Sequence, residues 1–235
     1  IKEARGCILA HSVRLPDGRL KKGLRIGVAE MAQLRDANLN SVVAARLEPG
    51  DVHEDEAAKR VAGLVRGDHV NTTDPFTGRV NFFAAMDGVF VADVCKVAHA
   101  NHINEGITIA TLPPYSRVRA TQLVATVKII PLAVSNASVS NLEAIAAADR
   151  LRLDVYPFQP KQVGLILSRL PGDADKVMAK RREAMATRVN SLSGSLVHLA
   201  ECAHREDVVA KEIRLAQEKD CDIIMVFGAS AIIDR

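Results

Sequence analysis

Two loops in the last third of the sequence carry side chains suited to binding an anion or a divalent cation. The first, residues 168–175, reads Ser-Arg-Leu-Pro-Gly-Asp-Ala-Asp. Ser168 supplies a hydroxyl, and Arg169 supplies a guanidinium that can bind phosphate through two hydrogen bonds. Asp173 and Asp175 supply carboxylates, which suit Mg²⁺. The alternative for these two acids is structural, because Asp is also favoured at the N-cap and in the first turn of a helix, which is expected directly after this loop.

The second loop, Gly228 to Asp234, follows the last apolar run of the sequence. It opens with Gly228, Ala229 and Ser230, which are small enough to let a ligand approach the backbone and its N–H groups. Asp234 adds a further carboxylate for Mg²⁺. The second loop is therefore expected to complement the first one in binding a phosphorylated ligand.

Other reactive side chains are explained more simply by structure. The acids that follow His53 are expected in the first turn of a helix, where they complement the helix dipole. His99 and His102 have a spacing compatible with zinc but lack a third ligand nearby, which favours a solvated helix end. Cys202 and His204 stand at a strand exit without a paired catalytic motif, so a Cys-His dyad is not favoured.

The two loops must be positioned by a parallel sheet. Apolar runs at residues 162–168, 196–200 and 222–227 predict buried strands, and the residues between them predict helices over 176–192 and 206–219. Strand, helix, strand, helix, strand at this spacing is typical of a parallel α/β sheet with right-handed crossovers. Since the loops that follow parallel strands face one edge, we expect both loops in one cleft. The inner positions expected on the first helix are Val177, Met185, Val189 and Leu192.

The residues before this sheet predict a different architecture. Apolar, β-branched runs at 107–112 and 123–130 predict a mainly antiparallel sheet or small barrel. Residues 135–150 predict an exposed helix and hinge. The fold class is therefore α/β, with an α+β domain over residues 1–157 and a parallel α/β domain over residues 158–235. A helix should follow the last strand, so we expect the second domain to be incomplete at its C-terminus.

The composition narrows the class of partner. The formal net charge is +3, and only 3% of the residues are aromatic. Basic residues are interspersed with acidic ones rather than gathered into a block, which favours a small anionic ligand over nucleic acid. Four isolated cysteines fit a cytoplasmic location, and the absence of a run of about 20 apolar residues argues against a membrane partner.

The second domain resembles the molybdopterin-binding domain of molybdenum-cofactor biosynthesis proteins. The shared features are an opening strand over Val163–Ser168, Asp175 before the first helix, and Asp222–Asp234, which matches the family's aspartate, apolar strand, small-residue loop and later acid. Where the family usually shows Gly-Gly-Thr-Gly or Gly-Gly-x-Ser, this chain has Gly-Ala-Ser-Ala. In the first domain, residues 3–12, 23–43 and 121–131 resemble, more loosely, the leading domain of bacterial relatives that are in some members fused to a cytidylyltransferase-like domain.

The resemblance implies a three-layer α/β/α domain that binds molybdopterin, a pyranopterin with a terminal phosphate and a dithiolene. It assigns Asp234 the catalytic and Mg²⁺-binding role. The cofactor-binding residues that it implies are Ser168, Arg169, Asp175, Gly228, Ala229 and Ser230. It also implies a homo-oligomer, and a partner in molybdoenzyme maturation or a fused transferase domain.

Three activities are compatible with the resemblance. The first is support of Mg²⁺-dependent nucleotidyl transfer to molybdopterin, or of molybdate insertion. The second is nucleotide processing by a competence-damage-like pyrophosphatase, since those chains use the same domain. The third is a carrier without turnover that holds molybdopterin or its nucleotide adduct.

Overall fold

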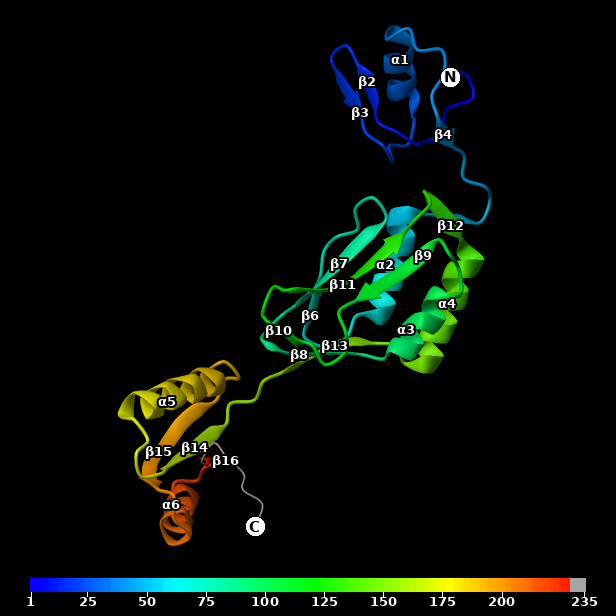
Figure 1. Ribbon diagram of the computed structural model, residues 1–235. Coiled ribbons are helices and arrows are strands. Elements are labelled where there is room, and N and C mark those ends of the chain that lie inside the picture. The colour runs from blue at the N-terminus through cyan, green and yellow to red at the C-terminus, as the bar shows by residue number, and fades with distance from the viewer. Residues whose placement is uncertain (229–235) are drawn as a thin grey trace. The chain divides into compact units, whose positions relative to one another are not determined.

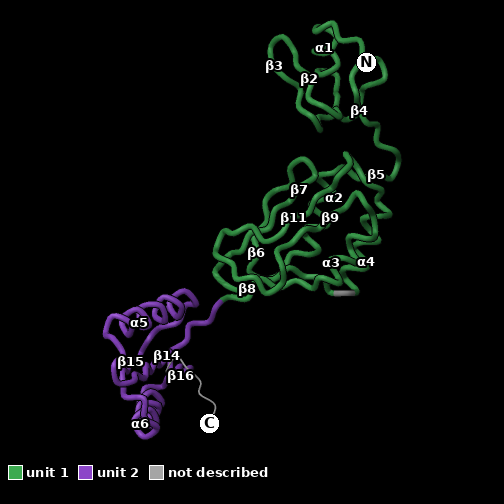
Figure 2. Tube along the Cα trace, viewed as in Figure 1, with its two compact units in different colours: residues 1–157 green, residues 158–235 purple. Residues whose placement is uncertain are grey.

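The computed structural model describes residues 1–228, apart from the side chain of Asp149 (Figure 1). The chain divides into two compact units, residues 1–157 and 158–235 (Figure 2). Helices and sheets are mixed along the chain, so the expected α/β class is confirmed. Within residues 1–228, every helix is too short or too polar to span a bilayer.

The first residues of unit 1 form a small α+β cluster with its own apolar core. Leu9, Ile26 and Leu34 are fully buried in this core. β2 and β3 form an antiparallel hairpin, in which Val13 lies opposite Leu20. The elements of this cluster are β1 (Ile8–Leu9), β2 (Val13–Leu15), β3 (Gly18–Leu20), α1 (Val28–Asp36) and β4 (Ala44–Ala45).

The rest of unit 1 is built on antiparallel ladders, as the β-branched runs predict. A four-stranded sheet has the order β6-β7-β11-β9, and a three-stranded sheet has the order β10-β8-β13. The elements are β5 (Asp51–His53), α2 (Glu54–Val65), β6 (Val70–Thr72), β7 (Arg79–Ala84), β8 (Gly88–Ala92), α3 (Val94–Asn101), β9 (Ile107–Thr111), β10 (Arg117–Val118), β11 (Leu123–Ile129), β12 (Ala133–Ser135), α4 (Asn136–Asp149) and β13 (Leu153–Pro157).

Helix α4 differs from the exposed helix and hinge that its Ser, Asn and Ala composition predicts. Val139, Leu142 and Ala146 recur at helical spacing and are buried in the main core of unit 1. Arg60 of α2 binds Glu143 of α4 through two nitrogens, at 2.9 and 2.8 Å. The prediction of an exposed hinge is therefore wrong, because a narrow apolar stripe is enough to bury one face of this helix.

Helix α2 begins with the acidic first turn that the sequence predicts. The side chain of His53 caps the helix by accepting a hydrogen bond from Asp55 N at 3.2 Å. Glu54 is only 3% exposed, and Lys128 Nζ lies 3.9 Å from its carboxylate. Burial raises the pKa of Glu54, although the charge of Lys128 opposes this shift.

Gly78, with φ of +69°, packs closely against Glu54, so that an added Cβ would lie 2.7 Å from Glu54 Oε2.

Unit 2 contains the parallel sheet that the sequence predicts. β14 (Gln162–Arg169) lies between β15 (Ser195–Ala203) and β16 (Ile223–Phe227), and both pairings are parallel. The crossover helices are α5 (Asp175–Asn190) and α6 (Glu206–Glu218). All three strands therefore end at the same edge of the sheet.

The central strand β14 contacts α5 through one face and α6 through the other. Leu165 and Leu167 pack with Met178 of α5. On the other face, a Cβ added to Gly164 would lie 3.1 Å from the Ala216 side chain of α6. Helix α5 is rotated relative to the expected register, since Met178 is buried and Val177 is 43% exposed. Among the other expected inner positions, Val189 is buried, Met185 is partly buried and Leu192 is exposed.

Candidate functional site

The carboxyl edge of the sheet in unit 2 brings together groups from all three strands. Ser168 is the penultimate residue of β14, and Phe227 is the last residue of β16. His204 comes directly after β15. Parallel pairing places Leu167 beside Phe227 and Ser168 beside Cys202, so these positions meet at one edge although they are far apart in sequence.

The Ser168 hydroxyl links the ends of the three strands. Its Oγ donates a hydrogen bond to the Phe227 carbonyl oxygen at 3.2 Å and lies 2.9 Å from Nδ1 of His204. The Ser168 residue is only 1% exposed. A buried hydroxyl with two partners is well satisfied and holds a fixed orientation. Ser168 therefore lies beneath the surface of the site and holds the ends of the strands in position.

A cavity of ≈ 490 Å³ opens beside this link, between the loop after β14 and the loop after β15. The two loops are tied together by a hydrogen bond from His204 N to the Arg169 carbonyl oxygen at 3.0 Å. The cavity combines imidazole and guanidinium groups with apolar side chains. Its lining residues are Arg169, Leu170, Pro171, Gly172, Ala203, His204 and Arg205.

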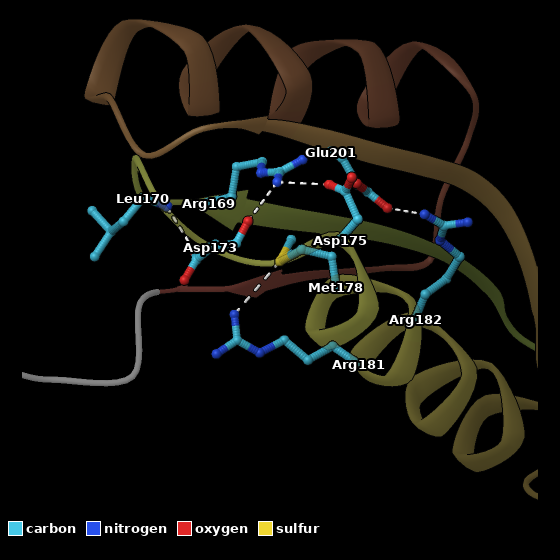
Figure 3. A network of polar contacts seen from close by, with 8 residues as sticks. All are labelled: Arg169, Leu170, Asp173, Asp175, Met178, Arg181, Arg182 and Glu201. Atoms are coloured by element: carbon cyan, nitrogen blue, oxygen red, sulfur yellow. Dashed lines mark hydrogen bonds and ion pairs between the residues drawn. The ribbon is translucent and has the colours of Figure 1, made fainter.

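Arg169 is held at the cavity by the loop that follows it (Figure 3). Its Nη2 donates to the Asp173 carbonyl oxygen at 2.7 Å and to the Asp175 carboxylate at 2.9 Å. Asp173 closes the loop by accepting from Leu170 N at 2.8 Å. A guanidinium carries five N–H groups, and both of these contacts use Nη2. Both two-nitrogen edges of the guanidinium include Nη2, so Arg169 is positioned by its own loop and can still donate single hydrogen bonds to an anion from Nε and Nη1.

The two loop carboxylates have structural roles. Asp175 is the first residue of α5 and lies in its acidic first turn, as the structural alternative predicts. The N-cap is Ala174 rather than Asp173, and its side chain makes no capping bond. The prediction of Asp173 as N-cap is wrong, because its carboxylate satisfies the backbone N–H of Leu170 inside the loop instead. Arg169 engages Oδ1 of Asp175, whose side chain is 93% exposed.

Gly228 follows β16 directly and lies next to the Phe227 carbonyl that Ser168 contacts. A Cβ added at Gly228 would meet no atom within 4 Å among the described residues. The other expected residues of this loop, Ala229, Ser230 and Asp234, lie outside the described residues. Ser168, Arg169 and Gly228 thus all lie at the edge where sequence reasoning expects them.

The structure assigns His204 a contact different from the Cys-His dyad considered above. Its Nδ1 contacts Ser168, whereas Cys202 is buried on β15. Burial raises the pKa of the Cys202 thiol, and the negative charge of Glu212 raises it further. A raised pKa disfavours the thiolate and so argues against Cys202 as a nucleophile. The contact between Ser168 and His204 was not predicted from the sequence, although both residues lie at the ends of adjacent strands.

Charged side chains of α5 line the sheet face next to the cavity. Arg181 places its guanidinium carbon 5.3 Å from the ring centroid of Phe227, and Arg182 forms an ion pair with Glu201 of β15 (Figure 3). These contacts connect α5 to β16 and β15. The two arginine side chains place positive charge beside the site but do not line the cavity.

Residues 1–228 contain no group of three or more His, Cys, Asp or Glu side chains arranged to hold a metal ion. Comparisons with protein-family models, curated proteins and solved structures found no significant match.

Proposed function

We propose that unit 2 binds molybdopterin at the carboxyl edge of its sheet, and that its helices and sheet form the three-layer α/β/α arrangement of molybdopterin-binding domains. The observation that carries the proposal is the joining of three strand ends by Ser168 beside a cavity of ≈ 490 Å³. Open α/β sheets bind ligands at this edge. The site therefore combines a buried, hydrogen-bonded serine, which holds the strand ends together, with a cavity that can take a ligand.

The residues at the edge fit a phosphorylated ligand. Arg169, His204 and Arg205 line the cavity, and each carries N–H groups that can donate to phosphate oxygens. Leu170 and Pro171 offer apolar surface for a ring system. Gly228 adds backbone that a phosphate can approach closely. These features match a pterin that ends in a phosphate.

Residues 1–228 hold no group of three or more His, Cys, Asp or Glu side chains arranged to bind Mg²⁺. Asp175 is engaged by Arg169, and Asp173 accepts a hydrogen bond from Leu170 N. Mg²⁺ sites are usually formed by one or two carboxylates together with water and phosphate oxygens. The Mg²⁺ role proposed for Asp234 falls outside residues 1–228. No nucleotidyl-transfer step is therefore derived from this geometry.

The function of the described residues is to bind and orient the ligand. Arg169 neutralises the phosphate while its contacts to Asp173 and Asp175 hold the guanidinium in place. Bound molybdopterin would supply a dithiolene for molybdenum. The protein's own contribution is the fixed position of the phosphate relative to the pterin ring, which a carrier and a transferase both need.

Calorimetric titration of the full chain with molybdopterin under anaerobic conditions tests this proposal. Arg169→Ala should weaken binding about 10- to 100-fold, the range expected when a hydrogen bond to a charged group is lost. Arg182→Ala is the matched control, because Arg182 pairs with Glu201 and does not line the cavity. It should leave the affinity unchanged.

Parallel titrations with ATP or CTP plus Mg²⁺ separate the alternatives. Nucleotide binding and Mg²⁺-dependent hydrolysis without pterin binding would replace the proposal with nucleotide processing. Pterin binding without turnover would identify a carrier. Absence of molybdopterin binding by the folded wild-type chain would overturn the proposal.

A further inference from the structure

The hydrogen bonds of Ser168 determine which ring nitrogen of His204 carries a proton. A carbonyl oxygen only accepts, so the Ser168 hydroxyl donates its single hydrogen to the Phe227 carbonyl at 3.2 Å. The contact of 2.9 Å between Ser168 Oγ and His204 Nδ1 must then run in the other direction. Nδ1 of His204 is therefore the donor, and Ser168 Oγ accepts from it.

This assignment leaves Nε2 as the ring nitrogen available to a ligand. His204 lines the cavity and is exposed, whereas Ser168 is buried. With a proton fixed on Nδ1, Nε2 carries a lone pair in neutral imidazole and an N–H in imidazolium. The protonated ring can donate from Nε2 to a phosphate and still donate from Nδ1 to Ser168.

We infer that Ser168 holds His204 in the Nδ1–H form, so that His204 Nε2 contacts the ligand's phosphate and makes its binding dependent on pH. Ser168 acts as a positioning residue and His204 as the contact residue. The inference rests on the proposed function for the identity of the phosphorylated ligand. It adds a specificity-determining residue that the sequence pattern does not assign.

The charged groups around His204 come from the two loops that form the cavity. Arg169 is paired with Asp175 on one loop, and Arg205 is paired with Asp207 at 2.7 Å on the other. From β16, the group that faces Ser168 is the backbone carbonyl of Phe227. The carboxylates of Asp175 and Asp207 are thus paired with the two guanidiniums. Protonation of His204 therefore adds a positive charge that has no carboxylate partner among these pairs.

The first test is the tautomer itself. Nitrogen-15 NMR distinguishes Nδ1–H from Nε2–H imidazoles, and a difference spectrum with His204→Gln assigns the signals among the seven histidines of the chain. The full-length wild type should show the Nδ1–H form at pH 8. Ser168→Ala should shift His204 toward Nε2–H, which loss of packing alone would not do. An Nε2–H form in the wild type would overturn the inference.

The second test compares wild type with His204→Gln in binding molybdopterin and inorganic phosphate at pH 5 and pH 8. Imidazole changes charge between these values. At pH 5, wild type should bind each ligand about tenfold more tightly than His204→Gln, as expected for loss of a charge-assisted hydrogen bond. At pH 8, the ratio of the wild-type affinity to the variant affinity should be close to one. Because both proteins are measured with the same ligand at each pH, the ratio reports the difference that His204 makes at that pH.

The outcomes separate the two proposals. A ratio that does not change between pH 5 and pH 8 overturns the role of His204, whatever the affinity for molybdopterin. Loss of molybdopterin binding with a pH-dependent ratio retained for inorganic phosphate overturns the proposed function and supports His204 as a phosphate contact. Absence of binding of either ligand overturns both.

Discussion

The main core of unit 1 and the sheet of unit 2 bury their apolar side chains to different extents. In unit 1, Phe82 of β7 is fully buried in a core that also includes residues of α2 and α4. In unit 2, Leu165 and Leu167 of β14 are fully buried, but Leu199 of β15 is 45% exposed and Val226 of β16 is 46% exposed. Burial in unit 2 is thus concentrated in its central strand.

This difference has a consequence for the site. Residues 163–168 of β14 are all buried, and Ser168 ends this run at the carboxyl edge. The cavity itself lies between two loops that follow β14 and β15. Unit 2 therefore places a fixed hydroxyl below loops that are more open to solvent. We expect sensitivity to substitution to be spread through unit 1 and concentrated in β14 within unit 2.

The largest expected effect of a single substitution is in the core of unit 1. Phe82→Ala should lower the free energy of unfolding of unit 1 by about 3–5 kcal/mol, because it removes a fully buried ring and leaves a cavity. Urea denaturation followed by hydrogen exchange with mass spectrometry would report each unit separately. Leu199→Ala in unit 2 is the contrasting variant and should cost much less, since Leu199 is 45% exposed. Equal losses would contradict the comparison.

A second substitution probes the central strand of unit 2. Gly164→Val should lower the free energy of unfolding of unit 2 by about 1–3 kcal/mol through overpacking, because a Cβ would lie 3.1 Å from both Ala216 and Cys221. Gly63→Ala is the control in unit 1. Its Cβ would meet no atom within 4 Å in α2, and it should stabilise that unit by about 0.5–1 kcal/mol. A neutral Gly164→Val would show that α6 does not pack closely on β14.

Two carboxyl groups of unit 1 should affect stability oppositely as the pH changes. Burial raises the pKa of Glu54, so the folded state holds this proton more tightly than the unfolded state. Its contribution to stability is full at low pH and falls as the pH rises from the ordinary glutamate range through the raised pKa. The hydrogen bonds from Arg60 lower the pKa of Glu143, so its contribution is present above the ordinary range and falls as the pH drops through the lowered pKa.

Unfolding of Glu54→Gln and Glu143→Gln between pH 3 and pH 7 measures these contributions. As the pH rises, the free energy of unfolding of Glu54→Gln should increase relative to that of wild type. The free energy of unfolding of Glu143→Gln should decrease relative to that of wild type over the same range. The same trend in both variants would contradict the assigned environments, in which Glu54 is 3% exposed and Glu143 is 34% exposed.

The parallel order of unit 2 could be predicted because its strands are continuous apolar runs separated by helix-length segments. The positions of Ser168 and Arg169 at the carboxyl edge follow directly from that order. The antiparallel ladders of unit 1 were likewise indicated by β-branched residues in alternation. Periodicity and residue type were sufficient for these features.

Features that depend on side-chain orientation could not be predicted in this way. The burial of Met178 rather than Val177 depends on a small rotation of α5 about its axis, and either register has an apolar residue near the sheet. The contact between Ser168 and His204 depends on where two strands end relative to one another. Asp173 and the N-cap differ by one residue, which is within the usual uncertainty of helix boundaries.

The smallest effect is expected at the edge of unit 2. Val226→Thr keeps a β-branched shape at a position that is 46% exposed, so the free energy of unfolding should change by no more than about 0.5 kcal/mol. Ile166→Thr on β14 is the matched variant, and it should cost several times more because Ile166 is fully buried. Both can be measured by urea denaturation of the full chain at two protein concentrations. A large loss in Val226→Thr that grows with protein concentration would mean that a second copy of the chain covers β16 in solution, as the expected homo-oligomer would allow. In that case the contrast between the two units would hold for the isolated chain and not for the assembly.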